Sequence, residues 1–233
     1  MPRSKSASRA VPIGLREQNK IDKRQRIVAA ARELFTRHGY TAATMRQIAS
    51  RAHVGLGTLF SYADDKRDLV FLIFNDELDA LTDRALASVR PGRPLVETLA
   101  AVFGAHYEHL ARNPVMSRLA LQELTFYYEG KQSETFHSIR ARLIAGIESA
   151  VADAQGRGEI RDDTDAATIS RYIFFLYSAA IRWWIAMPDP KPADGIADLR
   201  RLLSLQLEGL ATRGAAPPRT KVARLPVGRR RVA

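Results

Sequence analysis

The chain has 233 residues, a formal net charge of +11 and no cysteine. Its length allows one large or two small domains with a sizeable core, and the lack of cysteine excludes disulfide frameworks and thiolate metal sites. The longest apolar run, from Tyr172 to Ile181, is too short to span a bilayer, and the N-terminus has no apolar segment of the kind that directs secretion. We therefore expect a soluble, cytoplasmic protein that has no membrane partner.

The positive charge is spread unevenly along the chain. Residues 1–20 hold five basic residues and one acid, and residues 214–233 hold six basic residues and no acid. Both segments lack a periodic apolar face, so we expect a disordered basic arm and a disordered basic tail. Residues 21–66 have eight basic and four acidic residues, whereas residues 67–213 have seventeen and twenty. A protein that coats nucleic acid with its whole surface would not confine its basic charge in this way.

An amphipathic helix is predicted from Ile21 to His38. Gly39 stands where a glycine commonly ends a helix. The apolar residues that recur at helical spacing along it are Ile27, Ala30, Ala31, Leu34 and Phe35. This stripe predicts that the helix packs on its neighbours in a small domain.

Residues 44–63 have the pattern of a helix-turn-helix. Thr44 and Gln47 have the spacing of a capping box, which predicts a helix that starts at Thr44. Gly55 and Gly57 bracket a second short segment that is rich in hydroxyl side chains. Two short helices separated by a tight turn, with a basic flank, are typical of a motif that enters the major groove of DNA.

These residues resemble the DNA-binding domain of the tetracycline-repressor (TetR) family over about residues 21–75. His53, at the turn between the two short helices, replaces the glycine that is usual in the family, and it is among the residues that tolerate a left-handed backbone. The positions that carry the resemblance are Arg26, Ile27, Ala30, Ala31, Leu34, Phe35, Gly39, Tyr40, Thr44, Ile48, Ala49, Ala52, Val54, Gly57, Thr58, Leu59, Phe60, Asp65, Lys66 and Leu69.

The resemblance implies an all-α fold with about nine helices. An N-terminal three-helix helix-turn-helix DNA-binding domain, here residues 21–66, would precede a larger six-helix domain for ligand binding and dimerisation, here residues 67–213. It also implies a homodimer that responds to a small-molecule effector. A two-fold dimer would require double-stranded DNA with a roughly palindromic operator.

The resemblance further implies which side chains meet DNA. The segment from Gly55 to Tyr62 would lie in the major groove, and Arg46 is able to bind a guanine in a bidentate way. The predicted phosphate contacts are Thr44, Thr58, Tyr62 and Lys66. The residues predicted nearest the base edges are Arg46, Leu56 and Gly57, and Gly55, Phe60 and Ser61 complete the predicted DNA-binding set.

The basic arm before the first helix has two interpretations. It could lie in a minor groove beside the operator, as basic arms of other DNA-binding domains do, or it could add only non-specific attraction to phosphates. For the C-terminal tail, which contains the run from Arg229 to Arg231, a solvated tail is the expected interpretation.

Beyond Lys66 the chain is predicted to form one helix after another, separated by proline and glycine. Asp65 is placed to cap the first of these helices. The predicted segments are Lys66–Val89, Leu95–Ala111, Val115–Tyr128, Ser133–Gln155, a helix that is capped by Asp162, Asp163 or Thr164 and runs to Met187, and Ala193–Arg213.

The last two helices are candidates for the dimer interface, because the equivalent helices of the TetR family pair with their copies. The alternative is that their apolar stripes belong to the core of a single chain. The predicted interface residues are Phe175, Ala179, Leu199, Leu203 and Leu210.

The middle helices are rich in aromatic residues, and the family has a small-molecule pocket among the equivalent helices. Aromatic walls suit a small apolar or aromatic effector; the alternative is that these residues only fill the core. The predicted effector-binding residues are Phe103, Tyr107, Phe126, Tyr127, Phe136 and Trp183.

No catalytic motif is present, so we predict a protein that is not an enzyme and needs no cofactor or metal. His106, His109 and His137 leave a ligand or metal role open, although their spacing fixes no third ligand. The predicted function is a dimeric repressor that its effector releases from the operator. The alternatives are an activator, a general DNA-binding protein without an effector, and an enzyme or carrier for the pocket ligand.

Overall fold

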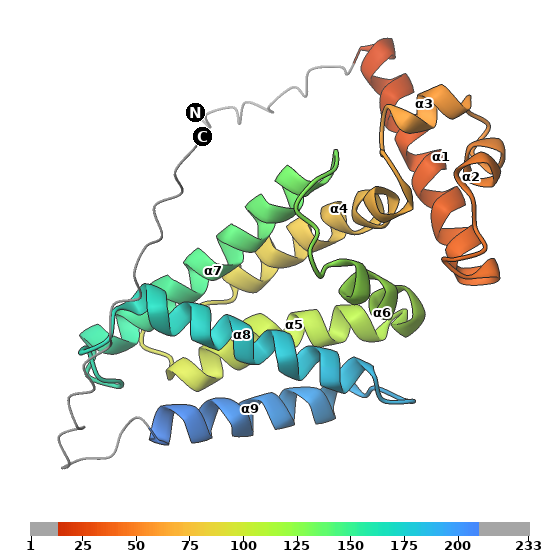
Figure 1. The fold of residues 1–233 in the computed structure, drawn as a ribbon. Helices are drawn as coiled ribbons and strands as arrows, with labels where there is room; N and C mark the ends of the chain where they lie inside the picture. The colour runs from red at the N-terminus through yellow and green to blue at the C-terminus, as the bar shows by residue number, and fades with distance from the viewer. Residues whose placement is uncertain (1–13, 210–233) are drawn as a thin grey trace, which may run out of the picture.

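The computed structural model describes residues 14–209, and within this range the chain folds into nine helices with no strand (Figure 1). The helices are α1 (Leu15–His38), α2 (Met45–Arg51), α3 (Leu56–Phe60), α4 (Lys66–Ala87), α5 (Leu95–Ala111), α6 (Pro114–Glu123), α7 (Ser133–Gly156), α8 (Ala166–Ile185) and α9 (Pro192–Gly209). The all-α fold and the order of its elements are therefore as predicted. The C-terminal tail, Leu210 and the first thirteen residues lie outside the described range.

Helix α1 begins six residues before the predicted start at Ile21 and takes up the last part of the segment expected to be a disordered arm. Gly14 is its N-cap, and Glu17 lies in the first turn, where a negative charge favours the helix dipole. Gln18 donates a hydrogen bond to Asp22 at 2.9 Å, one turn further along. These local interactions stabilise the turn without burying it, since Leu15 is 86% exposed.

Helices α1, α2 and α3 pack together around a small core, seen as a separate group at one end of the molecule in Figure 1. Fully buried Ile27, Ile48 and Leu59 contribute one residue from each of the three helices. The same core continues without a break into Leu69 and Ile73 of α4. The first turns of α4 thus complete the core of the predicted DNA-binding unit, although they follow the boundary expected after residue 66.

The end of α6 and the start of α8 also differ from the predicted positions. Helix α6 ends at Glu123 instead of continuing to Tyr128, because the chain turns away at Phe126, whose φ of 60° is incompatible with a helix. Helix α8 begins after Asp165, whose side chain accepts a hydrogen bond from the amide of Thr168 at 2.8 Å. Asp165 therefore provides the cap that was expected from residues 162–164.

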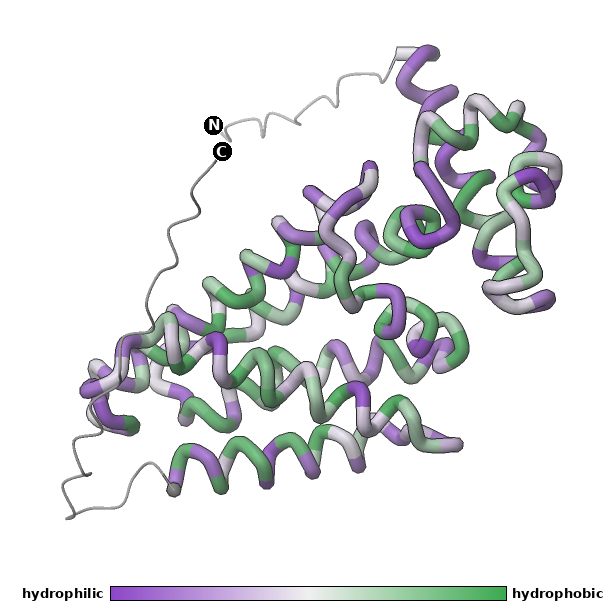
Figure 2. The backbone as a smooth tube through the Cα atoms, viewed as in Figure 1, coloured by the Kyte–Doolittle hydropathy of each residue, from purple (hydrophilic) through white to green (hydrophobic). Residues whose placement is uncertain are grey.

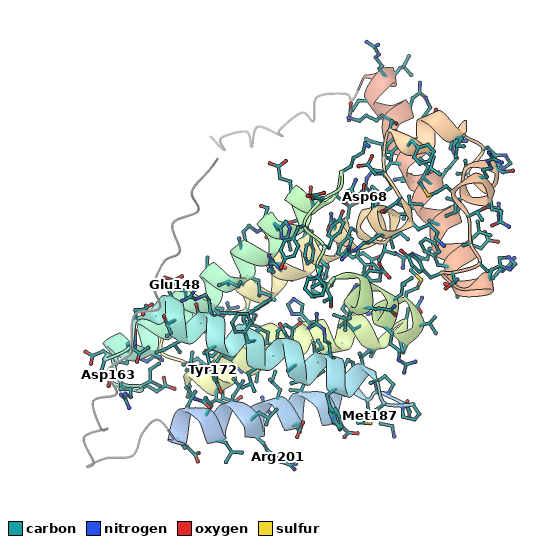
Figure 3. All side chains as sticks on the ribbon, in the orientation of Figure 1. Asp68, Glu148, Asp163, Tyr172, Met187 and Arg201 are labelled. Atoms are coloured by element: carbon teal, nitrogen blue, oxygen red, sulfur yellow. The ribbon has the colours of Figure 1, made fainter. Side chains whose placement is uncertain are left out.

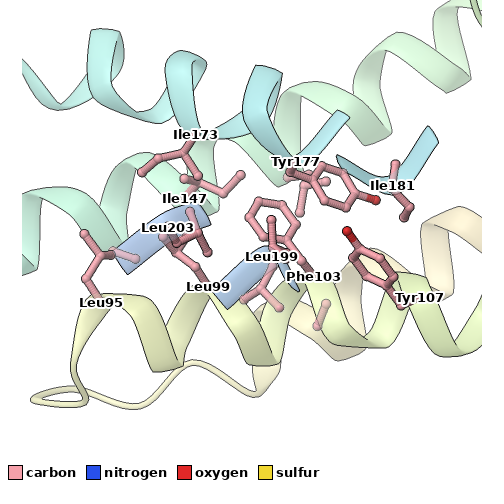
Figure 4. Close-up of a cluster of buried hydrophobic side chains, with 14 of the residues drawn as sticks. Leu95, Leu99, Phe103, Tyr107, Ile147, Ile173, Tyr177, Ile181, Leu199 and Leu203 are labelled. Atoms are coloured by element: carbon pink, nitrogen blue, oxygen red, sulfur yellow. The ribbon is translucent and has the colours of Figure 1, made fainter. Parts of the chain in front are cut away.

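The larger group of helices buries an apolar layer between α5, α7, α8 and α9, with α5 packed on α9 and α7 on α8 (Figures 1 and 2). Figure 4 shows Leu199 and Leu203 among the buried side chains of this layer. Leu199 and Leu203 are 0% exposed, which corrects their assignment to the dimer interface. Helix α9 packs its leucine stripe against its own chain, so the alternative interpretation holds for these two residues.

At Gly195, helix α9 lies so close to its neighbours that a side chain would not fit. A Cβ atom on Gly195 would lie 2.5 Å from ring atoms of Tyr107 and 2.7 Å from the indole ring of Trp184. Both rings are buried, so neither can move away cheaply.

We expect Gly195→Ala to lower the free energy of unfolding by about 1–3 kcal/mol, the usual range for overpacking a core. Gly104→Ala is the matched control, because its Cβ would meet Ile196 at an ordinary 3.4 Å. The control should be neutral or slightly stabilising, since alanine favours a helix over glycine. Urea unfolding of both variants checks the pair, and equal midpoints would contradict the packing argument.

Candidate DNA-reading face and ligand cavity

The segment from Thr44 through the turn between α2 and α3 is built as its sequence predicts. The amide of Gln47 donates to the Thr44 hydroxyl at 3.2 Å and the amide of Thr44 donates to the Gln47 side chain at 2.9 Å, which completes the capping box. His53 has the predicted left-handed backbone, with φ of 53°. Arg26 of α1 donates to the carbonyl oxygen of His53 at 3.3 Å and ties the turn to the first helix. These interactions connect the turn before α3 to both α1 and α2.

Most of the residues predicted to meet DNA are accessible to solvent. Thr44, Arg46, Gly55, Gly57, Phe60 and Ser61 are exposed, and Leu56, Thr58, Tyr62 and Lys66 are half-buried. Between them, Leu59 and Ala63 are 0% exposed and anchor α3 from the inside. Because the buried residues of α3 alternate with accessible ones, its small and polar residues are free to contact DNA. That contact remains a prediction.

Many of the basic residues in the DNA-binding unit are already engaged within the protein. Arg24 and Arg32 of α1 form ion pairs with Asp76 and Glu77 of α4. Glu33 pairs with two further arginines, Arg37 at 3.1 Å and Arg51 at 2.8 Å. Within the described part of segment 21–66, Lys23 and Arg46 are the cations for which no hydrogen bond or ion pair is found. Arg46 is therefore free to reach outward from the first turn of α2.

Two of the predicted phosphate contacts have additional structural roles that the sequence did not reveal. The ammonium group of Lys66 donates to the carbonyl oxygens of Tyr40 at 2.7 Å and Thr41 at 3.0 Å, and lies 4.9 Å from the ring centroid of Tyr40. The hydroxyl of Tyr62 donates to the carbonyl oxygen of Lys20 at 3.2 Å. Lys66 thus joins α4 to the loop before α2, and Tyr62 joins α3 to α1.

The larger domain contains an apolar cavity of about 110 Å³ between α4, α5, α6, α7 and α8. Of the six predicted effector residues, Phe136 lines this cavity. Phe103, Tyr107 and Tyr127 are buried in the surrounding core instead, whereas Phe126 is 78% and Trp183 70% exposed. The presence of an aromatic residue in the sequence did not show whether it would lie in the cavity wall, in the core or on the surface. The lining residues are Phe74, Leu78, Leu81, Thr82, His106, Leu110, Ala120, Leu121, Leu124, Phe136, Ile139, Arg140, Leu143, Phe174, Tyr177, Ser178, Ile181 and Arg182.

The polar groups of the cavity wall are few. His106 is buried, and its Nδ1 lies 3.2 Å from the carbonyl oxygen of Val102, to which it must donate. Burial lowers the pKa of His106 to about 4, so the ring is neutral at neutral pH. Thr82 and Ser178 add hydroxyl groups from α4 and α8, and Arg140 and Arg182 add guanidinium groups from α7 and α8. The wall can thus accept or donate a few hydrogen bonds within a mainly apolar space.

The other two histidines are used elsewhere. His109 lies 3.2 Å from Glu77 at the junction of α4 and α5, and His137 accepts a hydrogen bond from Arg140 at 2.9 Å. Burial and the nearby Arg140 lower the pKa of His137, which keeps it neutral and able to accept. Across residues 14–209, no three histidine or carboxylate side chains are grouped in a way that could hold a metal ion.

A buried carboxylate joins the DNA-binding unit to the segment that leads into α7. Asp68 in the first turn of α4 is 1% exposed, and Figure 3 places it where the two groups of helices meet. Its oxygens accept hydrogen bonds from the amides of Asp64 at 2.9 Å, Lys131 at 2.9 Å and Gln132 at 3.0 Å, and from the hydroxyl of Tyr127. The sequence gives no sign of these partners, which lie far from Asp68 along the chain.

Other groups near Asp68 also hold the segment between α6 and α7 in place. Gly130 has φ of 127° and approaches Asp68 so closely that a Cβ there would lie 2.6 Å from a carboxylate oxygen. Arg67 donates to the carbonyl oxygens of Glu123 at 2.6 Å and of Thr125 at the C-terminal end of α6. The end of α6 and the start of α7 are therefore both fastened to the first turn of α4.

A row of apolar side chains on α8 and α9 is exposed in the single chain. Tyr172 is 44%, Phe175 66%, Met187 39% and Leu205 69% exposed, and Ala179 is exposed between them. Figure 3 shows Tyr172 and Met187 towards opposite ends of α8. Soluble monomers seldom expose a contiguous apolar patch of this kind without a partner. Phe175 and Ala179 are thus accessible, whereas Leu210 lies outside the described residues.

Three packed helices that include a helix-turn-helix, followed by a larger helical domain with an apolar cavity, are typical of a DNA-binding regulator. Residues 27–73 match the family model described as bacterial regulatory proteins of the tetR family. Residues 27–73 thus form a DNA-binding domain of the TetR type, and the relatives that the chain matches over most of its length are named as transcriptional regulators and not as enzymes.

Individual relatives are similar over most of the chain. The fatty acid metabolism regulator protein of Bacillus subtilis is 24% identical over 83% of this chain and 98% of its own length. The transcriptional repressor KstR of Mycobacterium tuberculosis is 30% identical over 61% of this chain and 62% of its own. The crystal structure of Thermus thermophilus FadR, a repressor in complex with lauroyl-CoA, has a TM-score of 0.63 and 27% identity, and the match covers 84% of this chain and 98% of that chain.

None of the helices described between residues 14 and 209 combines the length and the apolar character needed to cross a membrane.

The buried, neutral His106 makes stability depend on pH. Its pKa falls from 6.5 to about 4 on folding, so the unfolded chain binds more protons between these values. The free energy of unfolding should therefore be fully retained above about pH 6.5 and fall by about 3 kcal/mol as the pH drops to 4. His106→Gln should flatten this part of the profile in urea titrations, and parallel profiles for the two proteins would contradict a neutral buried ring.

Proposed function

We propose that the chain is a dimeric repressor that binds a roughly palindromic operator and is released from it by an effector with an acyl chain, which enters the cavity between α4 and α8. Repression rather than activation is supported by the names of the relatives, among them the repressors KstR and FadR. The operator contacts proposed are those of the exposed surface of α2 and α3.

The observation that carries this proposal is the attachment of the cavity wall to Asp68. Leu124 and Phe136 line the cavity and flank the segment that supplies Tyr127, Lys131 and Gln132 to Asp68. Helix α4, which contains Asp68, also completes the core of the DNA-binding unit. A ligand that displaces the cavity wall therefore acts on α4, the helix that carries the reading head, by which we mean the DNA-binding unit of α1, α2 and α3.

An effector with an acyl chain is supported by the cavity and by two relatives. The cavity walls are mainly aliphatic and aromatic, which suits a hydrocarbon chain. The Thermus thermophilus relative was crystallised with lauroyl-CoA, and the Bacillus subtilis relative regulates fatty acid metabolism. Because about 110 Å³ is less than the roughly 300–1,000 Å³ of typical ligand pockets, such a chain must push the walls apart.

A dimer through α8 and α9 is supported by the exposed row from Tyr172 to Met187 and by Leu205. Burying this row against a second copy would remove the apolar surface from water. Two reading heads would also double the number of base pairs contacted, which a five-residue recognition helix needs for specificity. Sedimentation at micromolar concentration checks this arrangement, and a monomer that binds the operator with full affinity would contradict it.

We expect Arg46→Ala to relax the preference at one base pair of each half-site, at a cost of about 1–3 kcal/mol in operator binding. The reason is that Arg46 is free of internal partners and can reach a guanine edge from the start of α2. Selection of bound sequences from a random duplex pool checks this, with Lys23→Ala as the control for loss of charge alone. An unchanged selected motif would exclude Arg46 from base readout.

The proposed release is tested by measuring operator affinity with and without saturating dodecanoyl-CoA. We expect the ligand to weaken operator binding, with a coupling free energy of about 1–3 kcal/mol. Tyr127→Phe removes one hydrogen bond to the buried Asp68 carboxylate, worth about 1.5–3 kcal/mol, and should remove most of this coupling. Ligand affinity measured without DNA should change less than the coupling does.

The matched control is Tyr128→Phe, because Tyr128 is 66% exposed and next to Tyr127 in the chain. This variant should retain the full response to the ligand. Binding of dodecanoyl-CoA with no change in the operator affinity of the unmodified protein would refute the proposed function. An equal response of all three proteins would leave the function intact but exclude Asp68 as the point of coupling.

A further inference from the structure

We propose that Arg140 of α7 and Arg182 of α8 form an anion-binding subsite in the wall of the apolar cavity, so that the effector carries a negative charge at one end of its hydrocarbon body. This inference rests on the proposed function for the identity of the cavity as the effector site, and it adds the chemistry of the effector's polar end. Nothing in the apolar character of the cavity alone requires a charged ligand.

The first support is the charge balance of the wall. Arg140 and Arg182 are both half-buried and line the cavity, whereas none of the described residues that line it is an aspartate or glutamate. Arginine remains charged at all relevant pH values. Half-burying two positive charges beside apolar side chains is unfavourable unless an anion compensates them. The positive charge of the cavity wall is therefore not balanced by an acid in the wall, which favours a ligand with a negative group.

The second support is the way in which Arg140 is held. Its guanidinium lies 5.6 Å from the ring centroid of Phe136, and it donates to Nδ1 of His137 at 2.9 Å. Both partners are neutral, since the pKa of His137 is lowered by burial and by Arg140 itself. They orient the guanidinium without neutralising it, which leaves its charge and its remaining N–H groups for a ligand.

Arg182 is held in a similar manner. It donates to the backbone carbonyl oxygen of Ser178 at 2.8 Å, one turn back on α8. A carbonyl oxygen fixes the side chain but contributes no negative charge. Arg182 and Leu121 also belong to a shallow hollow between α6 and α8 that is open to solvent. Arg182 thus stands where the apolar cavity meets the outside, the place at which the polar end of an amphiphile would remain.

A neighbouring arginine shows the contrast. Arg142 lies two residues after Arg140 on α7 but points away from the cavity, where it pairs with Asp79 at 2.8 Å and Asp83 at 2.9 Å of α4. The protein therefore supplies acids to an arginine on the outer face of this helix and none to the arginine on the cavity face. Arg142 provides a matched control for any substitution of Arg140.

The experiment compares chains of equal length with different polar ends, using the full-length protein and isothermal titration. The probes are dodecanoate, dodecanoyl-CoA and the uncharged dodecanol. We expect each anion to bind at least about tenfold more tightly than dodecanol, which is equivalent to roughly 1.4 kcal/mol. Arg140→Gln and Arg182→Gln should each reduce this preference about tenfold, while Arg142→Gln should retain it.

The two anionic probes distinguish the source of the charge. If the Gln variants weaken dodecanoate but not dodecanoyl-CoA, the subsite holds a carboxylate attached directly to the chain. If they weaken dodecanoyl-CoA, it holds the phosphate groups of the coenzyme. Both results support the subsite. Equal binding of dodecanol and the anions, or a preference that survives in both variants, would overturn it while leaving an uncharged acyl effector possible.

A second probe pair keeps the test independent of acyl chains. Anilinonaphthalene sulfonate and phenylnaphthylamine share an aromatic skeleton and differ in the sulfonate, and both fluoresce in apolar cavities. If acyl compounds fail to bind, the proposed function is wrong in its ligand class, whereas the subsite still predicts a sulfonate preference that Arg140→Gln or Arg182→Gln removes. Loss of that preference in Arg142→Gln alone, or its absence in the unmodified protein, would refute the subsite.

Discussion

The buried carboxylate of Asp68 is the constraint on which the arrangement of the two parts depends. A carboxylate removed from water is costly unless its oxygens are hydrogen-bonded, and here three backbone amides and one hydroxyl satisfy them. Because these donors come from the turn before α4 and from the segment before α7, neither can shift without leaving the charge unsatisfied. The carboxylate thus couples the position of the turn before α4 to that of the segment before α7, although the two are far apart in the sequence.

The aromatic residues around Asp68 reinforce this constraint. Phe71, one turn further along α4, stacks on the ring of Tyr127 with centroids 3.7 Å apart, and Phe136 lies 4.9 Å from Phe71. These three rings form a small core of their own between the two larger ones. Phe136 therefore belongs both to this bridge and to the cavity wall, which gives a ligand a direct mechanical route to α4.

Much of the fold follows from local sequence rules. The capping box at Thr44, the cap at Asp65 and the left-handed turn at His53 each depend on a residue and its immediate neighbours, and each is found as predicted. The cap at Asp165 was missed because several adjacent acids and a threonine compete for that role, and spacing alone does not choose between them.

The site was less predictable, since periodicity shows that a helix has an apolar face but not what covers it. Leu199 and Phe175 lie on equally apolar stripes, yet the first is buried within its own chain and the second is exposed. Tyr107 and Trp183 likewise differ in burial only because other helices cover the first and not the second. The cations raise the same difficulty: nothing near Arg24 in the sequence reveals Asp76, fifty-two residues away.

The ion pairs of Arg24 and Arg32 with α4 have a mechanical consequence. They fasten α1 along the first half of α4, so the reading head and this helix behave as one rigid arm. With 22 residues, α4 is about 33 Å long. A tilt of about 5° around its far end would therefore carry the head sideways by about 3 Å, enough to take a recognition helix out of register with base edges in a groove about 12 Å wide. In the proposed dimer the two arms would double that displacement, so a small movement of the cavity wall would be enough for the proposed release from the operator.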